Sequence, residues 1–148
     1  MLTKLDIIND MLASTGTAPL TANDTSHPNY VKAEQKLDRV NRTVQGKGWW
    51  FNRAHRKLTQ SVDGEIILPS TTLHADPVDT SKGYVVRGNK LYDFAKGTYA
   101  INEDVEIVFV ELVNITDLPP TAEEYLRTRA VYEYYRDQDG VNPKLADY

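Results

Sequence analysis

The side chains that could do acid–base or metal chemistry are scattered through this sequence of 148 residues. Its three histidines, His27, His55 and His74, are far apart, and no His-x-x-x-His or His-Glu-x-x-His pattern places two of them on one helix face. The chain has no cysteine, which excludes disulfide bonds and thiolate metal sites. The sequence therefore predicts no metal site.

Two acidic clusters are the remaining candidates for a calcium ion or an acid–base pair. The run 137–140, Asp-Gln-Asp-Gly, is similar to the start of a calcium-binding loop, but its glycine comes too early and no glutamate follows at the twelfth loop position. Glu123 and Glu124 are adjacent, yet carboxylates in the first turn of a helix stabilise its positive end. Gly-x-Gly-x-x-Gly, P-loop and Gly-x-Ser-x-Gly patterns are also absent. We therefore predict no catalytic residue, no cofactor and no enzyme activity.

Basic residues are concentrated in one segment of an acidic chain. Residues 31–60 carry eight basic and two acidic side chains, a formal charge of +6, whereas the whole chain carries −4 and the remainder therefore −10. The segment also contains Trp49, Trp50 and Phe51, and positive charge with aromatic rings is typical of surfaces that bind single-stranded nucleic acid. A small nucleic-acid-binding accessory protein that uses this segment is the alternative hypothesis for function.

Two expectations argue against that alternative. Trp49 and Phe51 stand where the chain enters the centre of the fold, so we expect them to be core anchors between helices and sheet. The basic residues of the preceding helix are expected on more than one of its sides. They are Lys32, Lys36, Arg39 and Arg42.

The first two helices are predicted from apolar spacing and from their ends. Thr3 and Asp6 form a capping-box pattern at the start of the first helix, and Gly16 is placed to end it. The second helix has a narrow apolar stripe and stops at the glycines 46 and 48, where we expect Arg42 to fix the turn through a local hydrogen bond. Its stripe consists of Tyr30, Ala33, Leu37, Val40 and Val44.

A third helix is predicted after Pro119-Pro120. Thr121 and Glu124 form a second capping-box pattern, and the helix is expected to end before Gly140. Between the second and third helices the apolar period is that of strands, and Gly88-Asn89 predicts a hairpin. The expected strands are residues 50–59, 65–69, 84–87, 90–94 and 105–112. The last strand is apolar at nearly every position, so it is predicted to be central and covered on both faces.

This order of elements predicts an α+β fold, a helical bundle of two N-terminal helices plus a later helix with an inserted small antiparallel β domain. We expect a single domain over residues 1–148. Its helical part is predicted at residues 1–48 and 119–139, its β part at 49–113, and a mobile tail at 140–148.

Tyrosine is unusually frequent, with nine tyrosines against three phenylalanines. A tyrosine ring can be half-buried while its hydroxyl contacts water or a partner, so the residue is common at interfaces and also at the rim of a core. We predict contacts with other subunits or a partner protein at the hairpin tip and on the third helix. The candidate residues are Arg87, Gly88, Asn89, Lys90, Tyr125, Tyr132, Tyr134 and Tyr135.

The chain shows no pattern for a membrane. Its N-terminal segment has two aspartates among its apolar residues and lacks the basic flank of a signal peptide. No window approaches the ~20 apolar residues that a membrane-spanning helix needs. We expect no membrane partner.

Residues 41–52, Asn-Arg-Thr-Val-Gln-Gly-Lys-Gly-Trp-Trp-Phe-Asn, resemble a run in the tail tubular protein A family of short-tailed, podovirus-type phages. In that family a similar run ends the second helix before the chain enters a β domain. Three further stretches are similar in the same order: residues 8–16 to the family's first helix, Leu68-Pro69 to the end of an early strand, and residues 91–93 to its Leu-Tyr-Asp. The resemblance spans roughly residues 5–135.

The resemblance implies a structural virion protein of the head–tail junction, a head–tail connector or adaptor. Such a protein would form a twelvefold ring between the portal and the tail nozzle protein, with its helical part toward the portal and neighbouring copies and its β domain toward the nozzle. Genomic DNA would pass through the ring during ejection without sequence recognition, and an acidic lumen would repel its phosphates. Residues 31–60 would face acidic neighbours, and assembly is expected in the host cytoplasm.

The chain departs from the family pattern at its end. Members usually continue past the third helix into another helix and a C-terminal arm that docks on the portal, whereas this sequence stops at Tyr148. Either the adaptor is a short variant or the sequence is a trimmed product. No portal-docking residue is therefore transferred to this chain.

Overall fold

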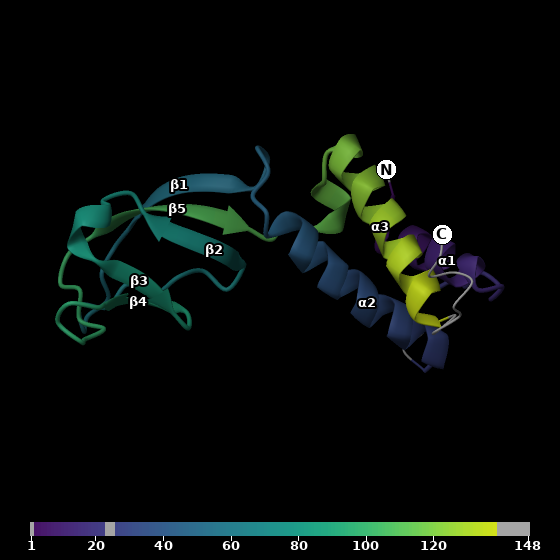
Figure 1. Cartoon of the computed structure of the whole chain (residues 1–148), viewed down its shortest axis with the longest axis horizontal. Coiled ribbons are helices and arrows are strands. Elements are labelled where there is room, and N and C mark those ends of the chain that lie inside the picture. The colour runs from purple at the N-terminus through teal and green to yellow at the C-terminus, as the bar shows by residue number, and fades with distance from the viewer. Residues whose placement is uncertain (1, 23–25, 139–148) are drawn as a thin grey trace. The chain divides into compact units, whose positions relative to one another are not determined.

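The computed structural model describes residues 2–22 and 26–138, which fall into two compact units. The helical unit lies within residues 1–44 and 114–148, and the β unit comprises Gln45–Val113. Helices and strands follow one another in the predicted order, and every strand pair is antiparallel (Figure 1). The predicted α+β fold is confirmed. The predicted mobile tail lies outside the described residues.

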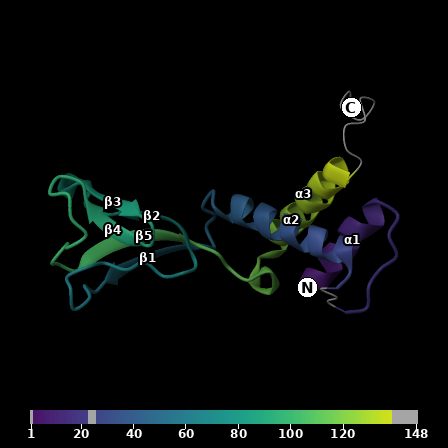
Figure 2. The ribbon, with the colours of Figure 1, turned by 90° about the horizontal axis from the view of Figure 1, so that it is seen from below.

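The helical unit begins as the sequence predicts. Its elements are α1 (Lys4–Ser14), α2 (Pro28–Gln45), the 3-10 turn η2 (Ile115–Asp117) and α3 (Pro120–Gln138). At the start of α1 the Thr3 hydroxyl accepts from the Asp6 backbone N–H at 3.1 Å, and the Asp6 carboxylate accepts from the Thr3 N–H at 2.9 Å. The predicted capping box is confirmed. α1 and α3 lie side by side in two perpendicular views (Figure 2).

Each of the three helices buries an apolar face within the helical unit. All five residues of the predicted stripe on α2 are buried, because steps of three and four place them on one face of the helix. They meet the buried faces of the other two helices, and a fully buried Leu or Ile side chain contributes about 1.5–3 kcal/mol. Those faces consist of Ile7, Ile8, Met11, Leu12, Ala122, Leu126, Ala130 and Tyr134.

The predicted start of the third helix was wrong. α3 begins at Pro120, and the Pro119 carbonyl accepts the first helical hydrogen bond from Glu123 at 2.9 Å. Proline is favoured at the first helical position because its ring fixes φ and its missing N–H needs no partner there. Thr121 therefore lies inside the first turn and does not cap it, and the Glu124 side chain pairs with Arg127 instead.

The β unit contains two antiparallel sheets. Its elements are β1 (Arg53–Leu58), β2 (Thr72–Pro77), the 3-10 turn η1 (Thr80–Lys82), β3 (Tyr84–Arg87), β4 (Lys90–Asp93) and β5 (Val105–Glu111). One sheet has the order β1-β5-β2 and the other is the predicted hairpin β3-β4, which turns at Gly88-Asn89. Gly88 has a φ of 67°, a left-handed conformation that favours glycine.

Two strand predictions were wrong in different ways. Residues 65–69 make only an isolated bridge between Ile67 and Lys90, although backbone bonds from Leu68 to Asn89 and from Leu91 to Ile66 attach this segment to the hairpin. Residues 72–77 form a strand that the sequence analysis did not predict, although polar and apolar residues alternate along it; its closing proline is the feature that argues against a strand. Proline is compatible with an edge strand, which is the place of β2 in its sheet.

The central position of β5 is confirmed, but its predicted cover on both faces was wrong. Val105, Ile107 and Phe109 are buried, whereas Glu106 and Val108 between them are exposed. One face of the sheet therefore packs on the core and the other is open. The buried core of this unit consists of Ile66, Leu68, Ala75, Leu91, Ile101, Val105, Ile107 and Phe109.

Candidate interaction surfaces

The candidate functional residues among those that the structure describes lie at its surface. Within residues 2–22 and 26–138, no group of three or more His, Asp or Glu side chains is placed to hold a metal ion. None of the described helices is long and apolar enough to cross a membrane. The part of the Asp-Gln-Asp-Gly run beyond Gln138 lies outside the described residues. The functional candidates are therefore the charged and aromatic side chains at the surface.

The predicted hairpin tip is an arginine held by two tyrosines. The guanidinium carbon of Arg87 lies 4.6 Å from the centre of the Tyr92 ring and 5.8 Å from that of Tyr99. The two rings meet edge to face, with centres 5.0 Å apart. The Lys90 ammonium lies 5.7 Å from the Tyr99 ring and 3.1 Å from the Glu65 carboxylate. This arrangement fixes the long side chain of Arg87 at the surface.

Sequence reasoning named Arg87 and Lys90 but missed the two tyrosines. Arg87 pairs with Lys90 across the hairpin, and Val85 pairs with Tyr92. Directly opposed residues in an antiparallel pair share one face, so these four side chains lie on the same side of the hairpin. The alternation along each strand is the signal that could have identified Tyr92.

The tyrosines predicted as contacts on α3 have different surroundings. Tyr125 and Tyr132 are exposed, with 42% and 62% of their surface accessible, and Tyr135 is half-buried. Tyr134 is buried at 2% and belongs to the core of the helical unit. The Arg136 guanidinium lies 5.9 Å from the Tyr132 ring. The outer face of α3 thus combines exposed tyrosines with arginine, residue types that are enriched in binding hot spots.

The residues predicted as structural anchors are not in either core. Trp49 and Phe51 are half-buried, with ring centres 6.0 Å apart, and Trp50, which is 79% exposed, meets Phe51 edge to face at 5.6 Å. None of the three lies in a strand; Trp50 and Phe51 form part of a turn before β1. Arg42 is exposed, and its side chain makes no ion pair or hydrogen bond with the residues that the structure describes.

Two buried amide side chains anchor this region instead. The Asn52 carbonyl oxygen accepts from the Trp49 N–H at 2.7 Å, and its amide donates to the carbonyls of Gln45 at 2.8 Å and Glu111 at 3.1 Å. Gln45 donates to the Val113 carbonyl at 2.9 Å and accepts from its N–H at 2.7 Å. These bonds join the first residues of the β unit to its last. Both amides lie in the 41–52 run that carries the family resemblance, and no other feature of the sequence pointed to them.

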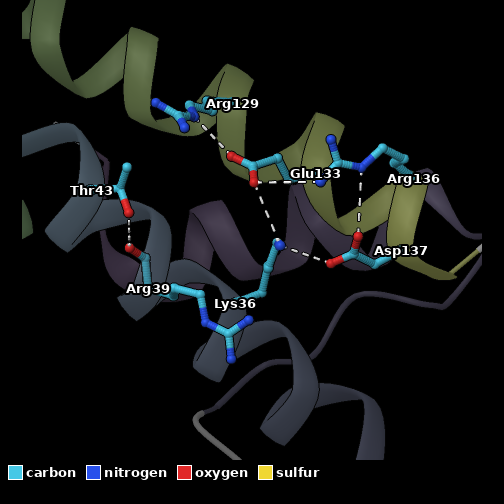
Figure 3. Close-up of polar contacts among 7 residues, drawn as sticks. All are labelled: Lys36, Arg39, Thr43, Arg129, Glu133, Arg136 and Asp137. Carbon is cyan, nitrogen blue, oxygen red and sulfur yellow. Dashed lines mark hydrogen bonds and ion pairs between the residues drawn. The ribbon is translucent and has the colours of Figure 1, made fainter.

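Ion pairs join α2 to α3. The Lys36 ammonium lies 2.8 Å from the Asp137 carboxylate and 3.5 Å from that of Glu133, and Arg129 and Arg136 surround the same two carboxylates (Figure 3). The hydrogen bond from Lys36 lowers the pKa of Asp137 below its ordinary value. The Lys36 side chain is only 13% exposed, so water screens this contact less than a typical surface pair.

Three of the four basic residues of α2 share one side of the helix. Lys32, Lys36 and Arg39 line one depression, together with Tyr134 and Asp137 of α3. The prediction was wrong for Arg39, because seven residues make nearly two helical turns and return it to the side of Lys32. Lys36 is neutralised by its ion pairs, whereas Lys32 and Arg39 make none with the described residues.

The open face of the three-stranded sheet carries both signs of charge. Arg53, His55 and Lys57 alternate along β1 and are exposed. The His55 ring nitrogen lies 3.5 Å from the Glu106 carboxylate of β5. On the other edge strand, His74 lies 2.8 Å from Asp76. The positive charge of β1 is therefore partly balanced by carboxylates on the same face.

An acidic pocket of about 250 Å³ lies beside the base of the hairpin. Glu103 accepts hydrogen bonds at 2.7 Å from Lys82 and from the Tyr84 hydroxyl, and both bonds lower its pKa. Burial and then this hydrogen bond raise the pKa of Tyr84 to about 12. The charged residues that line the pocket are Lys57, Asp79, Lys82, Glu103, Asp104 and Glu106.

Comparison with known proteins relates this chain to a family of phage tail proteins. The family model described as tail tubular protein matches residues 5–146. The "Tail tubular protein A" of Klebsiella phage KP34 is 28% identical over 145 residues, which cover 98% of this chain and 78% of that protein. Both matches extend across the helical unit and the β unit.

Proposed function

The chain belongs to the tail tubular protein family, and from that premise we propose that it is a ring-forming adaptor between the portal and the tail nozzle of a short-tailed phage. Membership makes it a structural protein of the phage tail, with its place in the virion tail. The proposal adds that its ring, of twelve copies, forms part of the channel through which genomic DNA leaves during ejection. Assembly would take place in the host cytoplasm.

One observation carries the proposal: the family match runs from residue 5 to residue 146, through both compact units. A match confined to one unit would support only a shared module. The similarity to the phage KP34 protein covers 98% of this chain and therefore also extends through both units. The family is a structural one, and we propose no catalytic role.

Three surfaces supply candidate contacts. The outer face of α3, with Tyr125 and Tyr132, would contact a neighbouring copy or the portal. The hairpin from Arg87 to Lys90 would contact a neighbouring copy or the nozzle. The acidic surplus outside residues 31–60 suits a channel that repels phosphate and lets DNA slide.

Native mass spectrometry of the purified protein, alone and with the portal ring of its phage, tests the proposal. We expect the protein to add to the portal as about twelve copies, in accordance with closed-ring symmetry. A protein that leaves the portal ring unchanged would refute the adaptor role while leaving membership of the family intact.

The same preparation tests a second candidate function, binding to nucleic acid. The observation that favours it is the exposed row of Arg53, His55 and Lys57, together with the exposed Trp50. Such binding would weaken steeply with salt and would fall on substitution Arg53→Ala or Lys57→Ala. Because Glu106 and Asp76 share that face, we expect no such affinity for the free protein.

A further inference from the structure

The positive charge of Arg87 is not balanced by an ion pair within the described residues. Its guanidinium is held over Tyr92 and close to Tyr99, yet it makes no ion pair with any residue that the structure describes. Lys90 on the same face is neutralised by Glu65 at 3.1 Å. An arginine side chain that is already stacked on aromatic rings loses little further conformational entropy when it binds a partner. Its planar guanidinium can bind a carboxylate with two hydrogen bonds.

The hairpin presents this arginine rigidly. Backbone bonds from Leu68 to Asn89 (2.7 Å) and from Leu91 to Ile66 (3.1 Å) fasten both sides of the tip to the segment beneath it. Val85, on the same face, leaves 42% of its surface exposed. A fixed arginine and tyrosines beside an exposed apolar residue have the composition of a binding hot spot.

The same unit carries a surface of opposite charge. The acidic pocket at the base of the hairpin is lined by four carboxylates and two lysines. Asp104 accepts a hydrogen bond from the Gln60 N–H at 3.0 Å but makes no ion pair within the described part of the chain. The volume of about 250 Å³ is enough for an arginine side chain.

We propose that the β units of neighbouring copies contact one another head to tail, with the Arg87 face of one copy against the acidic pocket of the next. The occupant of each surface is thus a second copy of this chain. This proposal rests on the ring-forming function proposed above and specifies which surfaces of neighbouring copies meet in the ring. In a contact between two different patches, each end of a growing row of copies keeps one patch free for the next copy. Such heterologous contacts form a ring where the rotation from copy to copy closes on itself.

Cross-linking tests this contact directly, because the chain has no cysteine of its own. In the double variant Asn89→Cys and Val78→Cys, one thiol lies at the hairpin tip and the other lines the pocket. A short bismaleimide should join copies of this variant into a ladder of multimers. Each single variant alone should give none, and a mixture of the two single variants should stop at dimers.

The cross-linking is performed on concentrated free protein and on protein mixed with the portal ring. A ladder in either sample supports the head-to-tail contact, even where the portal binds no protein and the adaptor role fails. No ladder in either sample overturns the contact, even where the portal takes up its full set of copies.

Charge reversal provides the second measurement. Arg87→Glu should raise the concentration needed for assembly roughly thirtyfold, the effect expected of a hot-spot arginine. Lys96→Glu, an exposed lysine of the same unit, makes the same charge change and should leave assembly unaltered. Adding Asp104→Arg to Arg87→Glu should restore assembly. Equal assembly of wild type and Arg87→Glu, or an effect of Arg87→Glu on DNA affinity alone, overturns the proposal.

Discussion

The two units are fastened by different chemistry. In the helical unit the bonds between helices are ion pairs at the rim of the core, such as Lys36 with Asp137, Lys4 with Asp38 and Arg127 with Asp10. In the β unit the segments that begin and end it are joined by neutral amides that are almost completely buried, Asn52 at 2% and Gln45 at 1% exposure.

This difference predicts different responses to the solvent. Ion pairs near the surface are weakened by salt and lose their attraction when one partner is neutralised. A buried amide bonded to backbone groups keeps its bonds whatever the salt, but its removal leaves desolvated N–H and C=O groups without partners. Helix packing should therefore depend on ionic strength and pH, whereas the closure of the β unit should not.

The largest expected effect comes from the core of the β unit. Phe109→Ala removes a fully buried ring from the central strand, and we expect a loss of about 3–5 kcal/mol in the free energy of unfolding. Amide hydrogen exchange of β5 measures it. Val108→Ala on the same strand, where the side chain is 37% exposed, is the control and should cost far less. Equal losses from the two variants would contradict the one-sided burial of this sheet.

The amide closure is the next test. Asn52→Ala removes three hydrogen bonds and leaves backbone groups of Gln45, Trp49 and Glu111 without this partner. We expect a loss of about 2–3 kcal/mol. Denaturant unfolding should give the same loss at low salt and in about 1 M salt, where the Debye length is about 3 Å.

Asn89→Ala is the matched control for that substitution, because the Asn89 side chain is exposed at the hairpin tip. It should change the free energy of unfolding by less than about 0.5 kcal/mol. If the cost of Asn52→Ala shrank in high salt, the contrast between the two units would be mistaken.

Lys36→Met tests the ionic side of the comparison. The substitution keeps most of the buried stem and removes the ammonium between Glu133 and Asp137. We expect a loss of about 1 kcal/mol at low salt that decreases in high salt. Lys32→Met on the same helix is the control, because Lys32 makes no ion pair with the described residues and should show no salt-dependent loss. A salt-independent loss for Lys36→Met would assign the role of Lys36 to packing.

The helical core and the hairpin could be predicted from the sequence because their signals are local. The apolar stripe from Tyr30 to Val44 fixes one face of α2, and Gly88-Asn89 fixes the two-residue turn. The capping box at Thr3 is likewise contained within four residues.

What escaped prediction depends on partners far away in the sequence. The Trp49-Trp50-Phe51 run is bulky enough for a strand, but the chain turns there. The Asn52 side chain holds the turn by binding the backbone of Trp49 and Gln45 before it and of Glu111 far along the chain. β2 has a weak pattern of its own and is a strand because β5 pairs with it. The Lys36 network joins residues about one hundred positions apart, and no spacing rule connects them.

The smallest effect, and the one that separates charge from packing, is the pH dependence of the pair between Lys36 and Asp137. Lys36 lowers the pKa of Asp137 below its ordinary 3.8, so near that pH the unfolded chain binds more protons at this residue than the folded one. Stability therefore rises with pH through this range: the contribution is complete above about pH 4 and is lost as the pH falls through the lowered folded pKa. Asp137→Asn should destabilise the protein slightly at neutral pH, by less than Lys36→Met because this carboxylate is 42% exposed, and should cost less at about pH 2 than at neutral pH. Denaturant unfolding of wild type and variant at both pH values measures this, with Asp117→Asn as the control, an exposed aspartate outside the network. A cost for Asp137→Asn that is equal at both pH values would mean that the side chain acts by its shape, and that the helical unit is fastened no differently from the β unit.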